Sequence, residues 1–212
     1  MPLVEKADIT LYYAPRTRSF RTLWFLEELG RDYRLEHIDL EKGEHKQPDY
    51  LRINPMGKVP TLSDQGTPIT ETGAIFSHLA DKYAPGELAP LIKDPKRSDY
   101  LKWLFFAAGV MEPAFCEKFF KWDVPPRRVA WGSFADMEKT MIEGLAAADP
   151  WLTGDQFTAA DVYVASNLHF GMLTKLFPET GAVSEYVALC AARPALKRAL
   201  AIEEGFIKSA AS

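Results

Sequence analysis

The chain has 212 residues, 47% hydrophobic and 25% charged, which is typical of a globular protein with room for two modest domains. Twenty-nine acidic residues against 25 Lys and Arg give a net charge of -4, which argues against a nucleic-acid surface with clustered positive charge. No apolar run is long enough to span a membrane, and neither Cys116 and Cys190 nor the histidines have metal or disulfide spacing, so we expect a cytoplasmic protein without a metal.

The first third of the chain alternates between strand and helix patterns. Strand residues are short apolar or β-branched runs, and the first helix ends at Gly30. The order β-α-β-loop-β-β-α predicts a thioredoxin-like α/β domain over residues 1–84, with a parallel first strand pair and an antiparallel final hairpin. We predict strands at 9–13, 33–40, 59–62 and 67–70, helices at 19–29 and 72–83, and a polar loop at 41–52.

The rest of the chain has helical periodicity throughout. Two prolines and a glycine within residues 84–90 mark a linker, placed at 85–93, and residues 94–212 are predicted to form an all-α helical bundle. Pro113 lies inside an apolar helical pattern, so a kink is expected there if the helix continues. Helices are expected to begin at Asp94-Pro95 and Pro125-Pro126, and to follow Pro178 and Pro194.

A second helix-start signal lies at residues 158–161. Thr158 precedes Asp161 by three positions, the spacing of a capping box with Asp in place of the usual Glu. The helix that follows is apolar nearly all round, so this cap is expected to be buried. We therefore interpret Asp161 as a structural residue and not as a catalytic one.

The most informative residue is Pro60, which interrupts an apolar strand pattern. Proline cannot donate to a sheet ladder, so it is found at strand edges, bulges or special turns. The Val59-Pro60 bond is a candidate cis peptide, which would turn the Val59 backbone outward to pair with an extended peptide. Glu71-Thr72 then opens a helix, where free N–H groups favour an anionic ligand. Together these features predict a glutathione site.

In three segments, residues 11–30, 54–72 and 151–161, the chain resembles the cytosolic glutathione transferases, and the likeness extends over nearly its full length. The resemblance implies a homodimer in which the thioredoxin-like domain binds glutathione and the helical domain supplies most of the second-substrate pocket. By position, the Val59 backbone before Pro60 would pair with the cysteinyl part of glutathione. Glu71 and Thr72 would hold the γ-glutamyl end, and His45 with Lys58 would bind the glycine carboxylate.

The reaction of this family depends on lowering the pKa of a thiol, since the thiolate is the nucleophile. The resemblance implies a hydroxyl donor near the start of the first helix. Serine-type members place it four residues before an arginine like Arg21, which selects Thr17. Ser19 is the nearest alternative, followed by Tyr13 at the end of the first strand. Arg18 lies where beta-class members carry a cysteine, which disfavours chemistry through a protein thiol.

The expected activity is conjugation of glutathione to an apolar electrophile, since the long helix after the linker is rich in apolar and aromatic residues. Two alternatives stay open at this point. One is a glutathione-dependent isomerase, dehalogenase or peroxidase on the same fold. The other is a non-catalytic binding module, because a fold by itself does not determine a function.

Overall fold

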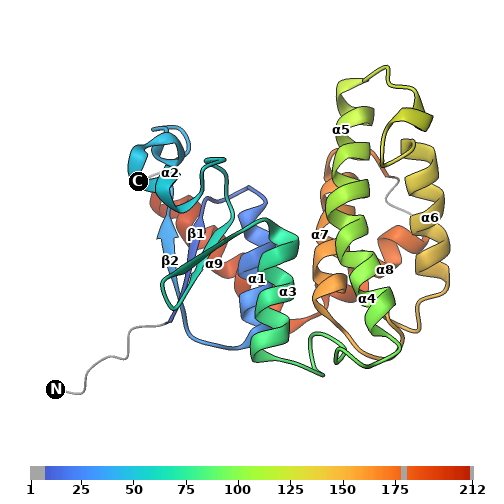
Figure 1. The fold of residues 1–212 in the computed structure, drawn as a ribbon, viewed down its shortest axis with the longest axis horizontal. Helices are drawn as coiled ribbons and strands as arrows, with labels where there is room; N and C mark the ends of the chain where they lie inside the picture. Colours follow the sequence, from blue (N-terminus) through green and yellow to red (C-terminus); the bar gives the residue numbers. More distant parts are fainter. Residues whose placement is uncertain (1–7, 178–180, 211–212) are drawn as a thin grey trace. The chain divides into compact units, whose positions relative to one another are not determined.

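The computed structural model describes residues 8–177 and 181–210. The chain forms two compact units, one of Met1–His78 with Pro194–Ser212 and the other of Leu79–Arg193. The first unit has a four-stranded sheet in the order β2-β1-β3-β4, and the second is helical (Figure 1). This confirms the predicted thioredoxin-like domain with an all-α partner. The domain boundaries at residues 84 and 93 stay a prediction. The last helix belongs to the same compact unit as the sheet.

In the first unit, the chain order is β1, α1, β2, α2, β3, β4 and the beginning of α3, followed much later in the sequence by α9. β1 pairs in parallel with β2 and antiparallel with β3, and β3 pairs antiparallel with β4, as the pattern predicts. The bounds are β1 Ile9–Tyr13, α1 Ser19–Leu29, β2 Tyr33–His37, a 3-10 turn η1 Glu44–Lys46, α2 Pro48–Ile53, β3 Thr61–Asp64, β4 Thr67–Thr70, α3 Thr72–Tyr83 and α9 Pro194–Ala210.

The two faces of the sheet have different neighbours because side chains alternate along a strand. Tyr12 meets Tyr50 of α2 edge to face, with ring centroids 5.8 Å apart. Tyr13 points the other way and is fully buried, with its ring 5.5 Å from Phe206 of α9. α9 also packs along α1 through an ion pair between Arg198 and Glu27 at 2.6 Å. Thus the end of the chain covers the face of the sheet that carries Tyr13.

Three predicted boundaries in this unit were wrong. β2 ends at His37 and not at residue 40, although the amide of Ile38 still donates to the Tyr13 carbonyl at 2.8 Å. β3 begins at Thr61, because Pro60 has no amide hydrogen to extend the ladder. The polar stretch 41–52 contains η1 and most of α2, and the missed signal was Pro48 at the first position of a helix.

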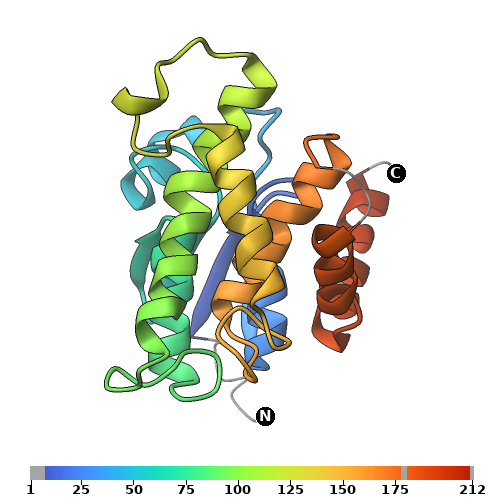
Figure 2. The same cartoon turned by 90° about the vertical axis from the view of Figure 1, so that its right-hand side faces the viewer.

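The second unit is a helical bundle, seen in green to orange in Figure 2. α4 packs on α7, α5 on α6, and α8 on both α6 and α7. None of the helices in the described ranges is long and apolar enough to cross a membrane. The bounds are α4 Arg97–Phe106, a π-helical turn η2 Ala107–Met111, α5 Glu112–Phe120, a 3-10 turn η3 Pro126–Arg128, α6 Phe134–Ala146, α7 Ala159–Leu173 and α8 Gly181–Ala191.

The irregularity expected at Pro113 takes the form of η2, which directly precedes α5. The carbonyl of Ala107 in this π-helical turn accepts a hydrogen bond from the Asn167 side chain at 3.0 Å. The predicted helix start at Pro125-Pro126 was wrong, since only the short η3 forms there and α6 begins after its N-cap Ser133. The start expected after Pro178 lies partly outside the described residues.

The capping box at the start of α7 is confirmed, and it is buried. One carboxylate oxygen of Asp161 accepts from the Thr158 amide at 2.7 Å, and the other accepts from the Leu152 amide at 2.9 Å. The Tyr186 hydroxyl donates to Asp161 as well. All of these bonds join Asp161 to other residues of the protein, so Asp161 has the structural role that the sequence predicts.

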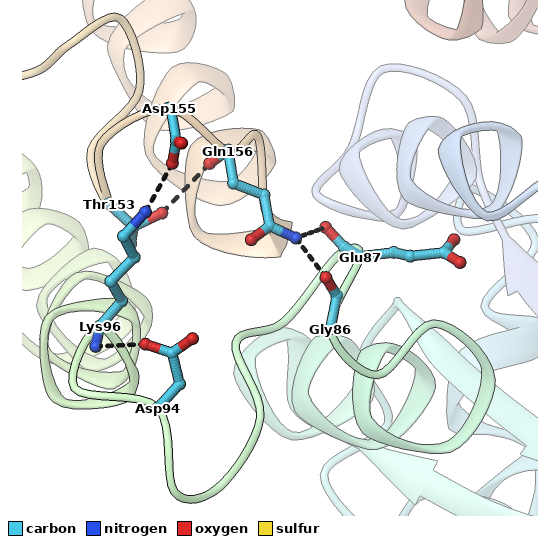
Figure 3. Close-up of polar contacts among 7 residues, drawn as sticks. All are labelled: Gly86, Glu87, Asp94, Lys96, Thr153, Asp155 and Gln156. Carbon is cyan, nitrogen blue, oxygen red and sulfur yellow. Dashed lines mark hydrogen bonds and ion pairs between the residues drawn. The ribbon is translucent and has the colours of Figure 1, made fainter.

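The linker is fastened to the loop before α7 (Figure 3). The Gln156 amide nitrogen donates to the carbonyls of Gly86 and Glu87, both at 2.6 Å. Lys96 forms an ion pair with Asp155 at 2.5 Å. These contacts give a proline- and glycine-rich segment a fixed path within the second unit.

Candidate functional site

The strand register brings the candidate site residues to one end of the sheet. Tyr12 of β1 lies opposite Thr61 of β3, and Thr61 lies opposite Thr70 of β4. The chain leaves β1, enters β3 and leaves β4 immediately beyond this row of residues. The loop at 14–18, the Val59-Pro60 segment and the Glu71-Thr72 pair therefore gather at the same sheet end.

The Val59-Pro60 bond is cis, as the sequence suggested. Val59 is half-buried, and within the described ranges no group is hydrogen-bonded to its backbone N–H or C=O. The neighbouring Lys58 carbonyl, by contrast, accepts from the Tyr50 hydroxyl at 2.6 Å and from the Asn54 side-chain nitrogen at 2.9 Å. A fixed backbone thus presents one open donor and one open acceptor at Val59.

Three residues that the sequence analysis did not assign to the site form this frame. The Thr61 hydroxyl lies 2.9 Å from both the Tyr50 hydroxyl and the Asn54 side-chain nitrogen, and all three side chains are buried. Asn54 also accepts from the Met56 amide at 3.1 Å, which closes the turn before Lys58. Asn54 belonged to the sequence motif, but Tyr50 lay in a segment predicted to be a loop.

His45 reaches the same region because η1 packs closely on the turn at Gly57. A Cβ atom at Gly57 would lie 2.6 Å from the His45 carbonyl oxygen, and Gly57 has a φ of +58°, so both space and backbone conformation require glycine. The Nδ1 atom of His45 is buried and has no hydrogen-bond partner among the described residues. The exposed Lys58 follows Gly57 directly. The close approach of Gly57 to the His45 carbonyl therefore brings together the backbones of His45 and Lys58, the two residues predicted to bind the glycine carboxylate.

Glu71 occupies a sparsely populated backbone conformation, with a φ of +66°. Its carbonyl accepts from the Ile75 amide at 2.9 Å, so it opens α3, and its side chain is exposed. Thr72, the first residue of the helix, is buried. The first amides of a helix have no partner within it and favour anions. A strained non-glycine residue at such a point is typical of a functional site.

The loop after β1 holds two hydroxyls in contact. Thr17 and Ser19 have their side-chain oxygens 2.7 Å apart, and each also lies within hydrogen-bond distance of the Ala14 carbonyl, at 2.7 and 2.8 Å. In addition, the Ala14 amide donates to Ser19 at 3.1 Å and the Ser19 amide donates to Thr17 at 3.1 Å. The two hydroxyls form one connected cluster at the start of α1.

Counting protons separates the two hydroxyls. Three oxygen–oxygen contacts in this cluster need a hydroxyl hydrogen: Thr17 to Ala14, Ser19 to Ala14, and Thr17 to Ser19. Thr17 and Ser19 supply only one hydrogen each, so one contact is without a hydrogen at any moment. Thr17 is half-buried and its hydrogen can turn outward while Ser19 continues to donate to the Ala14 carbonyl. Ser19 has no exposed surface and accepts the Ala14 amide, so it serves the loop itself. Of the two, Thr17 is the hydroxyl whose hydrogen can turn outward.

The third candidate hydroxyl, that of Tyr13, is hydrogen-bonded to a carboxylate. The Tyr13 hydroxyl donates to Glu203 of α9 at 2.8 Å, and the Arg16 amide donates to the same carboxylate oxygen at 2.8 Å. Burial, reinforced by the hydrogen bond to Glu203, raises the pKa of Tyr13 well above its ordinary value. A tyrosine committed to a carboxylate has no hydrogen left for a thiolate. Sequence reasoning missed Glu203 because 190 positions separate it from Tyr13.

Seven apolar residues give the long helix after the linker its aromatic character, and a minority of them are expected to line the second-substrate pocket. All seven lie in the second unit: Trp103, Phe106, Val110, Met111, Phe115, Phe119 and Trp122. Trp103, Met111 and Phe115 are buried in the bundle. Phe119 and Trp122, at the end of α5 and just after it, are 58% and 47% exposed. Three of the seven therefore belong to the core, Phe106 and Val110 are half-buried, and the last two are open to an apolar ligand.

Comparison with known proteins agrees with this arrangement. Residues 7–81 match the glutathione S-transferase N-terminal domain. Glutathione S-transferase GstA of Escherichia coli O157:H7 is 30% identical over 198 residues, covering 91% of this chain and 98% of GstA. The disulfide-bond oxidoreductase YfcG of Escherichia coli K12 is 30% identical over 166 residues, covering 73% of this chain and 76% of YfcG.

Solved structures show the same fold. The crystal structure of a glutathione transferase from Methylococcus capsulatus superposes with a TM-score of 0.78 at 29% identity, covering 92% of this chain and 98% of that one. The thioredoxin-like sheet, the helical unit that follows it and the similarity to GstA over nearly the whole chain all point to one family. The chain belongs to the glutathione S-transferase family.

Proposed function

We propose that this protein is a glutathione transferase that binds glutathione at the end of its sheet and activates the thiol with Thr17. The strand register is the observation that carries the proposal, since it gathers Thr17, Val59 and Glu71 at one sheet end. These segments offer an open backbone pair, a helix start and a hydroxyl. An extended tripeptide with a carboxylate at each end needs these three features.

Each part of glutathione has a matching group in this arrangement. The cysteinyl backbone pairs with the open N–H and C=O of Val59. The γ-glutamyl carboxylate meets the helix start and the Thr72 hydroxyl, and its ammonium group meets the exposed Glu71 carboxylate. The glycine carboxylate lies toward His45 and Lys58. No group of three His, Cys, Asp or Glu side chains in the described ranges could hold a metal.

The chemistry follows from the acidity of the thiol. A free thiol with a pKa near about 8.5 is mostly protonated at neutral pH. A hydrogen bond from Thr17, together with the positive N-terminal end of α1, stabilises the thiolate and lowers that pKa. The sulfur then forms a bond to the electrophilic carbon of an apolar substrate, and the leaving group departs with the bonding electrons. The thiol proton passes to solvent.

A second candidate function is favoured by the similarity to a disulfide-bond oxidoreductase. The same thiolate would attack a disulfide, forming a mixed disulfide and releasing a thiolate. Neither Cys116 nor Cys190 belongs to the segments that gather at the sheet end, so in this proposal glutathione itself supplies the sulfur. We also propose that the protein is cytoplasmic and forms a homodimer, as expected for this family. Sedimentation velocity tests the dimer.

Calorimetric titration with glutathione tests the binding site. We expect Glu71→Gln and Thr72→Val to weaken binding by about tenfold or more, because each removes one charged or hydroxyl partner of the γ-glutamyl end. Glu87→Gln, which changes an exposed acid of the linker, serves as the matched control and keeps the parent affinity.

Two outcomes would contradict the proposal. If the parent does not bind glutathione at millimolar concentration, the chain is a binding module of another kind. If all three variants bind as the parent does, glutathione lies elsewhere. Turnover of an activated aryl chloride, measured beside reduction of a small disulfide, separates the two candidate reactions.

A further inference from the structure

The carboxylate of Glu203 in α9 contacts the loop that carries Thr17. A single oxygen of Glu203 accepts from the Tyr13 hydroxyl and from the Arg16 amide, both at 2.8 Å. Tyr13 ends β1 and Arg16 immediately precedes Thr17. The carboxylate therefore connects the last residue of the strand to the turn that presents the hydroxyl.

The backbone conformation of Arg16 needs support from its surroundings, and the contact with Glu203 provides it. Arg16 has a φ of +58°, the left-handed region that non-glycine residues rarely occupy. Such a conformation persists only where the surroundings hold it. Glu203 accepts the amide of this residue, and the Thr17–Ser19 cluster holds the other side of the turn through the Ala14 amide and carbonyl. The turn is therefore fixed from both ends.

We propose that Glu203 is a positioning residue, which through the Arg16 amide and the Tyr13 hydroxyl holds Thr17 in the place where it meets the glutathione sulfur. This inference rests on the proposed function, because it assigns a supporting residue to the same site. A negative charge near a thiolate is by itself unfavourable, so the benefit of Glu203 lies in geometry. The last helix of the chain thereby becomes part of the thiol-activating apparatus.

Four variants separate geometry from charge. Glu203→Ala removes the acceptor, and Glu203→Asp keeps the charge but shortens its reach by one methylene. Glu203→Gln keeps an acceptor oxygen for both bonds and removes the charge. Glu204→Ala is the matched control, since the neighbouring Glu204 is exposed and pairs only with Lys208, at 2.8 Å, among the described residues.

The absorbance of bound thiolate near 240 nm, followed against pH, is the main readout. We expect Glu203→Ala and Glu203→Asp to raise the pKa of the bound thiol toward that of free glutathione. Their kcat/KM for 1-chloro-2,4-dinitrobenzene is expected to fall by about tenfold, as for a small misplacement of a catalytic group. The dissociation constant for glutathione stays within about threefold, since Val59 and Glu71 are untouched. Glu204→Ala should titrate as the parent does, and Glu203→Gln should have a bound-thiol pKa no higher than that of the parent, because it keeps the geometry and removes an unfavourable negative charge.

Hydrogen exchange of the Arg16 amide provides an independent readout in the parent and in Glu203→Gln, where it is expected to be slowed. Unprotected exchange would overturn the proposal, and so would Glu203→Asp or Glu203→Ala variants that titrate as the parent does. If Glu203→Ala does not fold, Glu203→Asp carries the comparison. A parent that binds glutathione without lowering its thiol pKa would refute the proposed function, and the positioning role would fall with it.

Discussion

The assignment of roles to three hydroxyls depends on where each hydrogen goes. Tyr13 gives its hydrogen to Glu203, Ser19 is buried and supports Ala14, and Thr17 alone can turn a hydrogen outward. Residue type would not have separated these candidates, since all three carry a hydroxyl near the start of α1. Burial and the direction of each hydrogen bond separate them.

We predict that Tyr13→Phe leaves the pKa of bound glutathione unchanged. The substitution removes a hydrogen bond to a carboxylate, so the protein should lose about 1–2 kcal/mol of unfolding free energy. Glu203 keeps the Arg16 amide and the loop keeps its conformation. Titration at 240 nm and chemical denaturation measure the two effects separately. A bound-thiol pKa that rises in this variant but stays at the parent value in Thr17→Val would instead make Tyr13 the donor.

Among the elements, the loop before α7 makes a prediction about pH. The ion pair with Lys96 lowers the pKa of Asp155, and the same contact raises the pKa of Lys96. A lowered carboxyl pKa contributes stability that is present above the ordinary value near about 3.9 and is lost as pH falls through the folded pKa. The lysine contributes below its ordinary value near about 10.4 and loses that contribution at higher pH.

Asp155→Asn should therefore lower the thermal midpoint slightly at pH 7 and leave it equal to that of the parent in strong acid. Both side chains are exposed, so salt near 1 M should also remove the difference, because the Debye length is then only about 3 Å. Scanning calorimetry of both proteins at two pH values and two salt concentrations measures this. A difference that survives acid and salt would show that Asp155 acts through something other than this ion pair.

The elements were predictable where their signals are local. α1, β1, β4 and α3 follow from apolar periodicity and the stop at Gly30, and the α7 cap follows from the spacing of Thr158 and Asp161. Elements without such signals were missed. α2 is polar and short. α6 begins after its N-cap Ser133, and the prediction placed the helix start at the more conspicuous Pro125 and Pro126 instead.

At the scale of the whole chain, contacts between distant segments were the part that sequence could not provide. Position along the chain assigned α9 to the helical domain, yet its Arg198 and Glu203 bind Glu27 and Arg16 in the first unit. The motif at residues 54–72 and the hydroxyls after β1 were found from local signals alone. The Glu203 carboxylate, which accepts from Tyr13 and Arg16 beside those hydroxyls, lies too far along the chain for any local pattern to reveal.

The first unit combines the beginning of the chain with its last helix, so the two units do not follow the order of the sequence. The first unit contains every residue proposed to bind glutathione, together with the helix that supports the Thr17 loop. The second holds the buried capping box, the anchored linker and the exposed aromatic residues near the end of α5. Changes in glutathione binding should therefore arise from substitutions in the first unit.

The most direct measurement is the pKa of the glutathione thiol when bound, in the parent and in Thr17→Val. Valine keeps the shape of threonine and lacks its hydroxyl. We predict a bound-thiol pKa well below the free value of about 8.5 in the parent and a return toward that value in the variant, with glutathione still bound. A lowered pKa that is the same in both proteins would contradict the assignment of Thr17 as the activating residue.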